Sequence, residues 1–199
     1  MTTVVDLIRH GEPVGGKKYR GQTDDPLSEK GWQQMRAAVA EHRPWDAIIT
    51  SPLTRCRAFA EELAQRHTLP LRSDERLKEI AFGEWEGKTA EQVQAANPGI
   101  IQRFFLDPLA NRPAGAEPVT DFLARVARAW DDMLQDHAGQ HLLVVCHAGV
   151  IRMSMAHLLG IPAQRAYRIQ VGNAAITRFS IEQHDGQYLP RLLFHDGRL

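Results

Sequence analysis

Three short apolar runs, each followed within three residues by a glycine or a proline, divide the chain. They are Val4 to Ile8, Asp46 to Thr50 and Leu142 to Cys146. Their β-branched and aliphatic residues do not alternate with polar ones, which is typical of strands buried on both faces of a sheet. The pattern therefore predicts three strands of a covered, parallel sheet.

Helical periodicity fills much of the remaining chain. The helices predicted from it start or end at recognisable cap and turn residues, with Ser28 as an N-cap and Gly160 as a terminator. They cover Ser28 to about His42, Ser51-Pro52 to about His67, Thr89–Asn97, Val119–His137 and Gly149 to Leu159. Alternating segments at Ala175–Ile181 and Tyr188–Phe194 predict two late strands.

Strands that alternate with helices imply right-handed crossovers. We therefore expect an α/β fold of three layers, a mostly parallel sheet flanked by helices on both faces. With 199 residues, 43% of them apolar and 24% charged, one globular domain over residues 1–199 is expected.

Charge and termini narrow the classes of partner. The formal net charge is zero, so no long-range field gathers nucleic acid or an anionic membrane. The first apolar run is short and interrupted by Asp6, which predicts neither a signal peptide nor a membrane span. Two cysteines and no export signal favour a reduced, cytoplasmic setting. The oligomeric state is not fixed by the sequence.

Each of the three predicted strands delivers candidate phosphate ligands at its carboxyl end. Arg9 and His10 follow the first strand, Arg55 lies in the first turn after the second, and His147 follows the third. Ligands of parallel sheets bind beyond the carboxyl ends of the strands. Cations and helix N-termini that converge there would form an anion site within a neutral protein.

These residue types suit phosphoryl transfer. Gly11 lets the backbone turn after His10, and a neutral imidazole with one nitrogen bonded to a carbonyl is a competent nucleophile near pH 7. Arg9 and Arg55 can hold non-bridging phosphate oxygens, and His147 can donate to the same oxygens.

A leaving alkoxide also needs a proton, and Glu79 is the predicted donor. It lies in an irregular segment between predicted helices, and it could later return as the base that activates water. Apart from its motif, nothing in the sequence distinguishes it from Glu84 or Glu86.

Five blocks of sequence carry a resemblance to a known family. They are LIRHGE (7–12), RGQTDDPLSEKG (20–31), ITSPLTRCRAFAEEL (49–63), LKEIAFGEWEG (77–87) and VVCHAGVIR (144–152). In this order they resemble the histidine phosphatase superfamily, which implies a phosphoglycerate mutase-like fold. The resemblance implies that His10 is phosphorylated, that Arg9, Arg55 and His147 hold phosphate, and that Glu79 donates the proton. Because arginines can carry the charge of the phosphoryl group, we expect no metal and no cofactor.

The chain departs from the family pattern in the loop after His10. Family members often carry an asparagine three or four residues after HGE, whereas this chain has Pro13, Gly15 and Gly16. They also often have glutamine where this chain has Arg20, before a glycine aligned with Gly21. We expect Arg20, Gly21 and Gln22 at the phosphate or the leaving group, with Arg20 in the place of the missing asparagine.

The resemblance also bears on the substrate. Mutases of the superfamily carry longer inserted segments, and the short stretch between Gly87 and Leu142 therefore favours hydrolysis of a small phosphate ester. The sequence looks closest to bacterial α-ribazole phosphatases, which remove the 5′-phosphate of α-ribazole phosphate in cobalamin biosynthesis. A broad-specificity phosphatase or a mutase-like enzyme remains an alternative.

Substrate selection is expected in a small helical cap over about 82–119. Its candidate contact residues are aromatic or polar: Trp85, Phe104, Phe105 and Asn111-Arg112-Pro113. Such rings could stack on a flat base. They could equally pack two helices together.

The same residues allow three other interpretations: a cysteine phosphatase, a non-catalytic phosphate-binding module and a metal site. Cys146 and Arg152 have the C-x5-R spacing of cysteine phosphatases, but that interpretation leaves Arg9, His10 and Arg55 unexplained. A non-catalytic phosphate-binding module is expected to lack His10, Arg55 or Glu79, and all are present. A metal site of His10, His147 and Glu79 lacks compact ligand spacing.

Other polar residues are expected to be structural. Arg125 and Arg128 are predicted to form a solvated face of a helix. Ser51, at a strand-to-helix turn, is expected to cap the helix that follows it.

Overall fold

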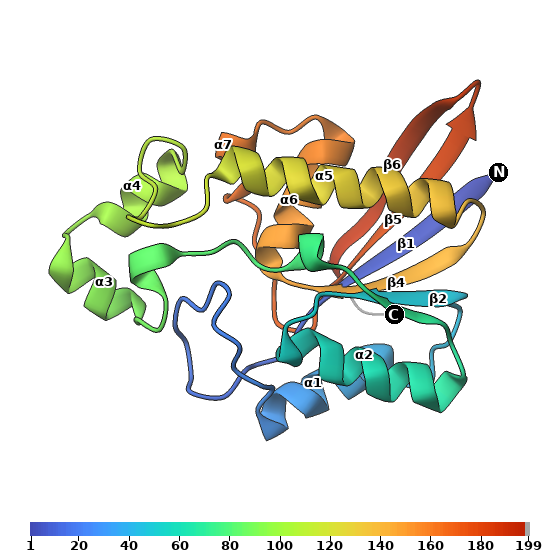
Figure 1. Cartoon of the computed structure of the whole chain (residues 1–199), viewed down its shortest axis with the longest axis horizontal. Helices are drawn as coiled ribbons and strands as arrows, with labels where there is room; N and C mark the ends of the chain where they lie inside the picture. Colours follow the sequence, from blue (N-terminus) through green and yellow to red (C-terminus); the bar gives the residue numbers. More distant parts are fainter. Residues whose placement is uncertain (198–199) are drawn as a thin grey trace.

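The computed structural model describes residues 1–197 and has a six-stranded sheet covered by helices on both faces (Figure 1). Along the sheet the strands are β3 (Leu71–Ser73), β2 (Ala47–Thr50), β4 (His141–Cys146), β1 (Thr2–Arg9), β5 (Ile176–His184) and β6 (Gln187–Gly197). The first four are parallel neighbours, and β5 and β6 continue the sheet as antiparallel strands. The expected three-layer α/β fold is confirmed.

The register of the central strands brings their carboxyl ends to one edge. Val145 of β4 pairs with Ile8 of β1 on one side and with Thr50 of β2 on the other. The residues that follow these three positions therefore leave the sheet side by side, as the strand order predicts for a ligand site.

Two long helices cover each face of the sheet. On one face lie α1 (Glu29–Val39) and α2 (Thr54–His67), and on the other α5 (Val119–Asp136) and α6 (Ala148–Leu159) (Figure 1). The buried side chains of β4 alternate between the two layers: Val144 packs with α5 and α6, whereas Val145 packs with α1 and α2. Both are fully buried, which explains the unbroken apolar run of the sequence.

The cap region extends beyond the carboxyl ends of the strands (Figure 1). Between residues 82 and 119 it contains the 3-10 turn η2 (Gly83–Trp85) and the short helices α3 (Ala90–Ala96) and α4 (Ile100–Leu106). Thr89 and Gln92 form a reciprocal capping box that fixes the start of α3. The cap therefore stands over the edge at which the candidate residues emerge.

The sequence missed the shortest elements. These are β3, α4, the four-residue α7 (Ala163–Ala166) and the 3-10 turn η1 (Glu75–Leu77). Such segments hold too few residues for periodicity to be recognised. No helix within residues 1–197 is long and apolar enough to cross a membrane.

Candidate active site

A cavity of about 350 Å³ lies at the carboxyl edge of the sheet. Most of the candidate residues line it: Arg9, His10, Arg20, Gly21, Arg55 and Glu79. His147 and Gln22 are not among its lining residues. The structure thus gathers residues from four separate sequence blocks around one space.

His10 is held in the geometry of a nucleophile. Its Nδ1 lies 2.8 Å from the carbonyl oxygen of Gly11, to which it donates in the neutral tautomer with the proton on Nδ1. Burial, together with Arg55 and Arg9, holds the pKa of His10 well below its usual range. The imidazole is therefore neutral near pH 7, and the lone pair on Nε2 is free for attack.

A close approach of two glycines fixes the turn that carries His10. A side chain at Gly11 would lie 2.2 Å from the carbonyl oxygen of Gly31, and one at Gly31 would lie 2.1 Å from that of Glu12. The Ser28 hydroxyl also donates to the Glu12 carbonyl over 2.9 Å. The first turn of α1 thus clamps the backbone that positions the imidazole.

Arg9 is partly buried and Arg55 is buried, and within residues 1–197 each has a buried N–H donor without a partner. Arg9 donates from Nη1 to the Val171 carbonyl over 2.7 Å, and its Nε has no partner. Arg55 is 1% exposed and donates to the carbonyls of Thr23 and Gly21 over 2.8 and 2.7 Å, while its Nε is also unpaired. Two unmatched N–H groups beside a neutral histidine leave a positive site that an anion can complete.

His147 is in direct ring contact with His10, although it is not among the residues that line the cavity. The two rings meet edge to face with centroids 5.2 Å apart, and Nε2 of His147 lies 2.8 Å from the Ser51 hydroxyl. Ser51 also accepts from the amide of Leu53 over 3.3 Å, so its own proton is available to Nε2. This pairing favours the tautomer with the proton on Nδ1. The expectation that Ser51 caps a helix was wrong, since the N-cap of α2 is Leu53.

Backbone amides hold the carboxylate of Glu79 at the cavity. Its oxygens accept from Ile80 over 3.0 Å and from Gly149 over 3.1 Å. A side chain at Gly149 would lie 2.1 Å from the Glu79 carboxylate, so glycine is needed where α6 begins. The helix start that follows β4 therefore places the proposed acid.

Arg125 of α5 was wrongly expected on a solvated face. It donates to the carbonyls of Lys78 and Glu79 over 2.7 and 3.1 Å and pairs with Glu117 over 2.7 Å. Its side chain is 14% exposed. Arg125 thus braces the irregular segment that carries Glu79, and no periodicity in the sequence indicates such long-range contacts.

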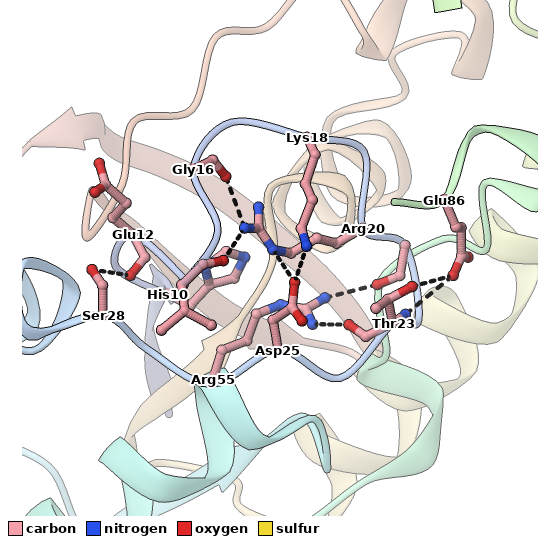
Figure 2. A network of polar contacts seen from close by, with 12 residues as sticks. His10, Glu12, Gly16, Lys18, Arg20, Thr23, Asp25, Ser28, Arg55 and Glu86 are labelled. Carbon is pink, nitrogen blue, oxygen red and sulfur yellow. Dashed lines mark hydrogen bonds and ion pairs between the residues drawn. The ribbon is translucent and has the colours of Figure 1, made fainter. Parts of the chain in front are cut away.

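Arg20 closes the loop that follows His10 (Figure 2). Its Nη2 donates to the carbonyls of Val14 and Gly16, and its Nε donates to Asp25 over 2.9 Å. Lys18 also pairs with Asp25, over 2.8 Å. Two nitrogens of Arg20 are thus engaged in the loop, which leaves its Nη1 for the role of phosphate ligand expected from the sequence.

Gly21 and Gln22 belong to the same loop. Gly21 has a left-handed backbone, with φ of 53°, and a side chain there would lie 2.2 Å from a Glu86 oxygen. Its carbonyl accepts from Arg55, so the loop and α2 are joined at this point. Gln22 donates to the Glu79 carbonyl over 3.3 Å and lies outside the cavity.

The cap contributes aromatic side chains to the far wall of the cavity. Phe82, Phe104 and Phe105 line it, together with Tyr19 and Tyr167. Trp85 is 3% exposed and packs against Tyr19 and Phe104, with centroids 4.9 and 5.4 Å apart. Trp85 and residues 111–113 are absent from the cavity lining. Trp85 therefore has a packing role, whereas Asn111 and Arg112 donate to the carbonyls of Asp107 and Ala116 within the cap.

Three of the polar residues of the wall without an assigned role from the sequence come from the last part of the chain. Arg152 appeared in the sequence only in the C-x5-R spacing, and Tyr167 and Asn173 in no motif. All three follow β4 in the chain, in segments where only spatial proximity reveals the contact.

The cysteine interpretation does not fit this geometry. Cys146 is fully buried, is absent from the cavity lining and is followed directly by α6 rather than by a loop. Burial raises the pKa of its thiol well above the usual range, which opposes a thiolate. Within the described part of the chain, no group of three His, Cys, Asp or Glu side chains is placed to hold a metal ion.

Comparisons with known proteins show the family to which the chain belongs. The family model of the histidine phosphatase superfamily (branch 1) matches residues 5–191. A bifunctional protein of Mycobacterium tuberculosis is 31% identical over 176 residues, which cover 86% of this chain and 48% of that protein. The chain thus spans about half the length of this relative.

Two further relatives match over most of both chains. Phosphoserine phosphatase 1 of Hydrogenobacter thermophilus is 29% identical over 183 residues, which cover 89% of this chain and 86% of that protein. The solved structure of a mycobacterial glucosyl-3-phosphoglycerate phosphatase superposes with a TM-score of 0.87 at 27% identity, covering 97% of this chain and 98% of the other.

Proposed function

Because this chain belongs to the histidine phosphatase superfamily, we propose that it hydrolyses a small phosphate monoester through a phosphohistidine at His10. One observation carries the proposal. A neutral His10, with Nδ1 bonded to a carbonyl and Nε2 free, lies beside the buried, unpaired Nε groups of Arg9 and Arg55. A nucleophile next to unmatched cationic donors is what phosphoryl transfer requires.

In the proposed first step, Nε2 of His10 attacks phosphorus while the ester bond to the leaving alcohol breaks. Arg9 and Arg55 stabilise the charge on the non-bridging oxygens, and His147 donates from Nδ1 to the same group. Glu79, protonated in the substrate complex, gives its proton to the departing alkoxide. The products of this step are a free alcohol and phosphohistidine.

In the second step the roles of Glu79 and the nucleophile change. Glu79, now a carboxylate, removes a proton from a water molecule that attacks the phosphohistidine. The bond between phosphorus and Nε2 breaks, inorganic phosphate leaves, and both His10 and Glu79 return to their starting states. The short segment between Gly87 and Leu142, in which the cap has only the two short helices α3 and α4, supports hydrolysis rather than a mutase reaction.

We further propose α-ribazole 5′-phosphate as the substrate. The aromatic wall formed by Phe82, Phe104, Phe105, Tyr19 and Tyr167 supports this choice, because a flat benzimidazole packs well on such rings. The cavity volume of about 350 Å³ falls in the range of small-molecule sites. Relatives named for phosphoserine and for glucosyl-3-phosphoglycerate make carboxylated phosphate esters the necessary comparison.

The test is phosphate release from a panel of substrates by the wild type and by His10→Ala. The panel contains α-ribazole 5′-phosphate, O-phosphoserine, 3-phosphoglycerate and phenyl phosphate. We expect His10→Ala to lose at least about 10³-fold of kcat/KM on every member, as removal of a covalent nucleophile does. Preference for α-ribazole 5′-phosphate would support the substrate, whereas slow turnover of all members that still needs His10 would refute it. Activity untouched by the substitution would refute the mechanism.

A further inference from the structure

The wall of the cavity that carries Arg152 and Tyr167 is not used by the steps above. Tyr167 follows α7 and Arg152 lies in α6, and both line the cavity together with Glu79. Among the charges that act on either residue, that of Glu79 is the strongest. Since Glu79 is the proposed proton donor to the leaving oxygen, this wall faces the alcohol part of the substrate.

Tyr167 has a fixed ring and an unpaired hydroxyl. The residue is 4% exposed, and its ring packs against Phe104 with centroids 4.9 Å apart. Its hydroxyl is shielded from solvent and has no hydrogen-bond partner within residues 1–197. Buried hydroxyl groups are rarely left unmatched, because the lost hydration destabilises the fold. The hydroxyl is thus a polar group still without a partner.

Arg152 is a cation without a matching anion. Its Nε donates to the Ile169 carbonyl over 2.9 Å, and its guanidinium lies over the Tyr167 ring, 5.5 Å from the centroid. The ion pairs of the described chain include none to Arg152, so both terminal amino groups remain for the cavity. Burial lowers the pKa of Arg152 from its usual value, and the charge of Glu79 offsets this effect only in part.

The first cluster of cations does not account for Arg152. Arg9 ends β1 and Arg55 follows β2, whereas Arg152 reaches the same cavity from α6, with its guanidinium over the Tyr167 ring. The charge of Arg152 also acts on Arg9, so the two cations share one cavity. Arg152 thus adds a cation on the wall that carries Tyr167.

We propose that Arg152 and the Tyr167 hydroxyl form a leaving-group subsite that binds oxygen atoms of the alcohol released by hydrolysis. This inference rests on the proposed function. The shared chemistry is an oxygen acceptor on the alcohol part, supplied either by ribose hydroxyls or by a carboxylate. A planar guanidinium above a fixed phenol suits both, whereas an alcohol without such oxygens gains nothing from the subsite.

The experiment compares substrates that differ in those oxygens. Steady-state kinetics are measured with α-ribazole 5′-phosphate, O-phosphoserine and phenyl phosphate for the wild type, Arg152→Gln and Tyr167→Phe. We expect either variant to lose about tenfold to a hundredfold of kcat/KM on the oxygen-bearing substrate that the wild type prefers. Phenyl phosphate should change by no more than about twofold, because it makes no bond to the subsite.

Matched controls and a second measurement keep folding separate from binding. Arg168→Gln and Tyr188→Phe change exposed residues of the same type, and should leave all three substrates unaffected. Tyr167→Phe should also raise the Tm of the free protein by about 2–4 °C, since it removes an unpaired buried hydroxyl. Turnover of phenyl phosphate reports that each variant is folded.

The outcomes separate the subsite from the proposed function. A loss confined to O-phosphoserine assigns the acceptor as a carboxylate, and a loss confined to α-ribazole 5′-phosphate assigns it as ribose hydroxyls. The inference would be overturned if either variant lost as much kcat/KM on phenyl phosphate as on the oxygen-bearing substrates. Wild-type kinetics of Arg152→Gln on all substrates would also overturn it. In both of those cases, dependence of phenyl phosphate turnover on His10 would leave the proposed function intact.

Discussion

Strand β1 carries two polar clusters that differ in how completely they are satisfied. Asp6 lies inside the sheet, fully buried, and accepts from Trp45, Arg178 and His141 at distances of 2.7 to 2.9 Å. His10, which follows the same strand, lies among arginines with unpaired donors. The first cluster is complete within the protein, and the second is not.

The difference shows which cluster serves the fold and which serves a ligand. In the Asp6 cluster one carboxylate is matched by a guanidinium and two further donors, so nothing else is needed. Around His10, Arg9 and Arg55 each have a buried Nε that finds no partner in the part of the chain that the structure describes. Folding alone does not compensate these groups, and an incoming phosphate can.

The largest effect is expected from Glu79→Gln, which changes the carboxylate that lines the same cavity as His10. The amide cannot give or take the proton, so kcat should fall about 10²- to 10⁴-fold on an alkyl phosphate. The fall should be smaller on phenyl phosphate, whose leaving group is less basic. The control is Glu84→Gln, which changes an exposed carboxylate of the same segment. Equal losses on both esters would argue against Glu79 as the acid.

In the Asp6 cluster, Asp6→Asn should lower the free energy of unfolding and leave catalysis unchanged. The variant leaves the Arg178 guanidinium without its buried anion, which costs about 3–5 kcal/mol of unfolding free energy. Urea denaturation measures the loss, with exposed Asp185→Asn as control. At a temperature where the variant stays folded, its kcat/KM should match the wild type, and a large catalytic defect there would contradict the division between the clusters.

Inorganic phosphate should stabilise the protein by binding to Arg9 and Arg55 in the cluster around His10. At a hundredfold excess over its Kd, a ligand that binds only the folded state adds about 2.7 kcal/mol. Thermal unfolding with and without phosphate measures this gain, which should shrink in Arg55→Gln and persist in the exposed-surface variant Arg57→Gln. An undiminished gain in Arg55→Gln would place the anion elsewhere.

The smallest effect expected is a separation of the two clusters by pH. Burial and the neighbouring arginines lower the pKa of His10, so the unfolded chain binds its proton first and unfolding becomes easier as pH falls below about 6.5. Burial alone would raise the pKa of Asp6, but hydrogen bonds from His141, Arg178 and Trp45 outweigh it, and the net shift is downward. The stabilisation by Asp6 is therefore present above about pH 3.9 and is lost only below it.

Denaturation curves between pH 5 and 7 test this order. His10→Asn should reduce the pH dependence of the unfolding free energy by at most about 1.4 kcal/mol per pH unit, the slope set by one proton. Asp6→Asn should leave the slope in this interval unchanged. The reverse pattern would mean that the pKa of His10 is not lowered by its surroundings.

The sequence alone predicted the parts of the site that follow strands. Apolar runs end at Arg9-His10, Ser51 and His147, and the rule for parallel sheets then brings these positions together. Glu79 needed the family resemblance, since it lies in an irregular segment without periodicity. The longer helices and central strands were predicted because burial leaves a repeating apolar pattern.

Contacts between distant segments could not be predicted in this way. Arg125 braces Glu79 from 46 positions along the chain, and Arg178 reaches Asp6 from 172 positions. Tyr167 comes to the cavity wall through the four-residue helix α7, which has no sequence signature. Such placements depend on how elements pack, and a single sequence carries no local sign of them.

The phosphohistidine mechanism is tested most directly by detection of a phosphoryl group on His10. Glu79→Gln is mixed rapidly with phenyl phosphate, quenched in alkaline denaturant and digested for mass spectrometry, with His10→Ala in parallel. A phosphohistidine intermediate predicts a burst of phenol approaching one per protein and an acid-labile phosphoryl group on the peptide that contains His10. Continued phenol release without that group, or with a phosphoryl group on Cys146, would contradict it.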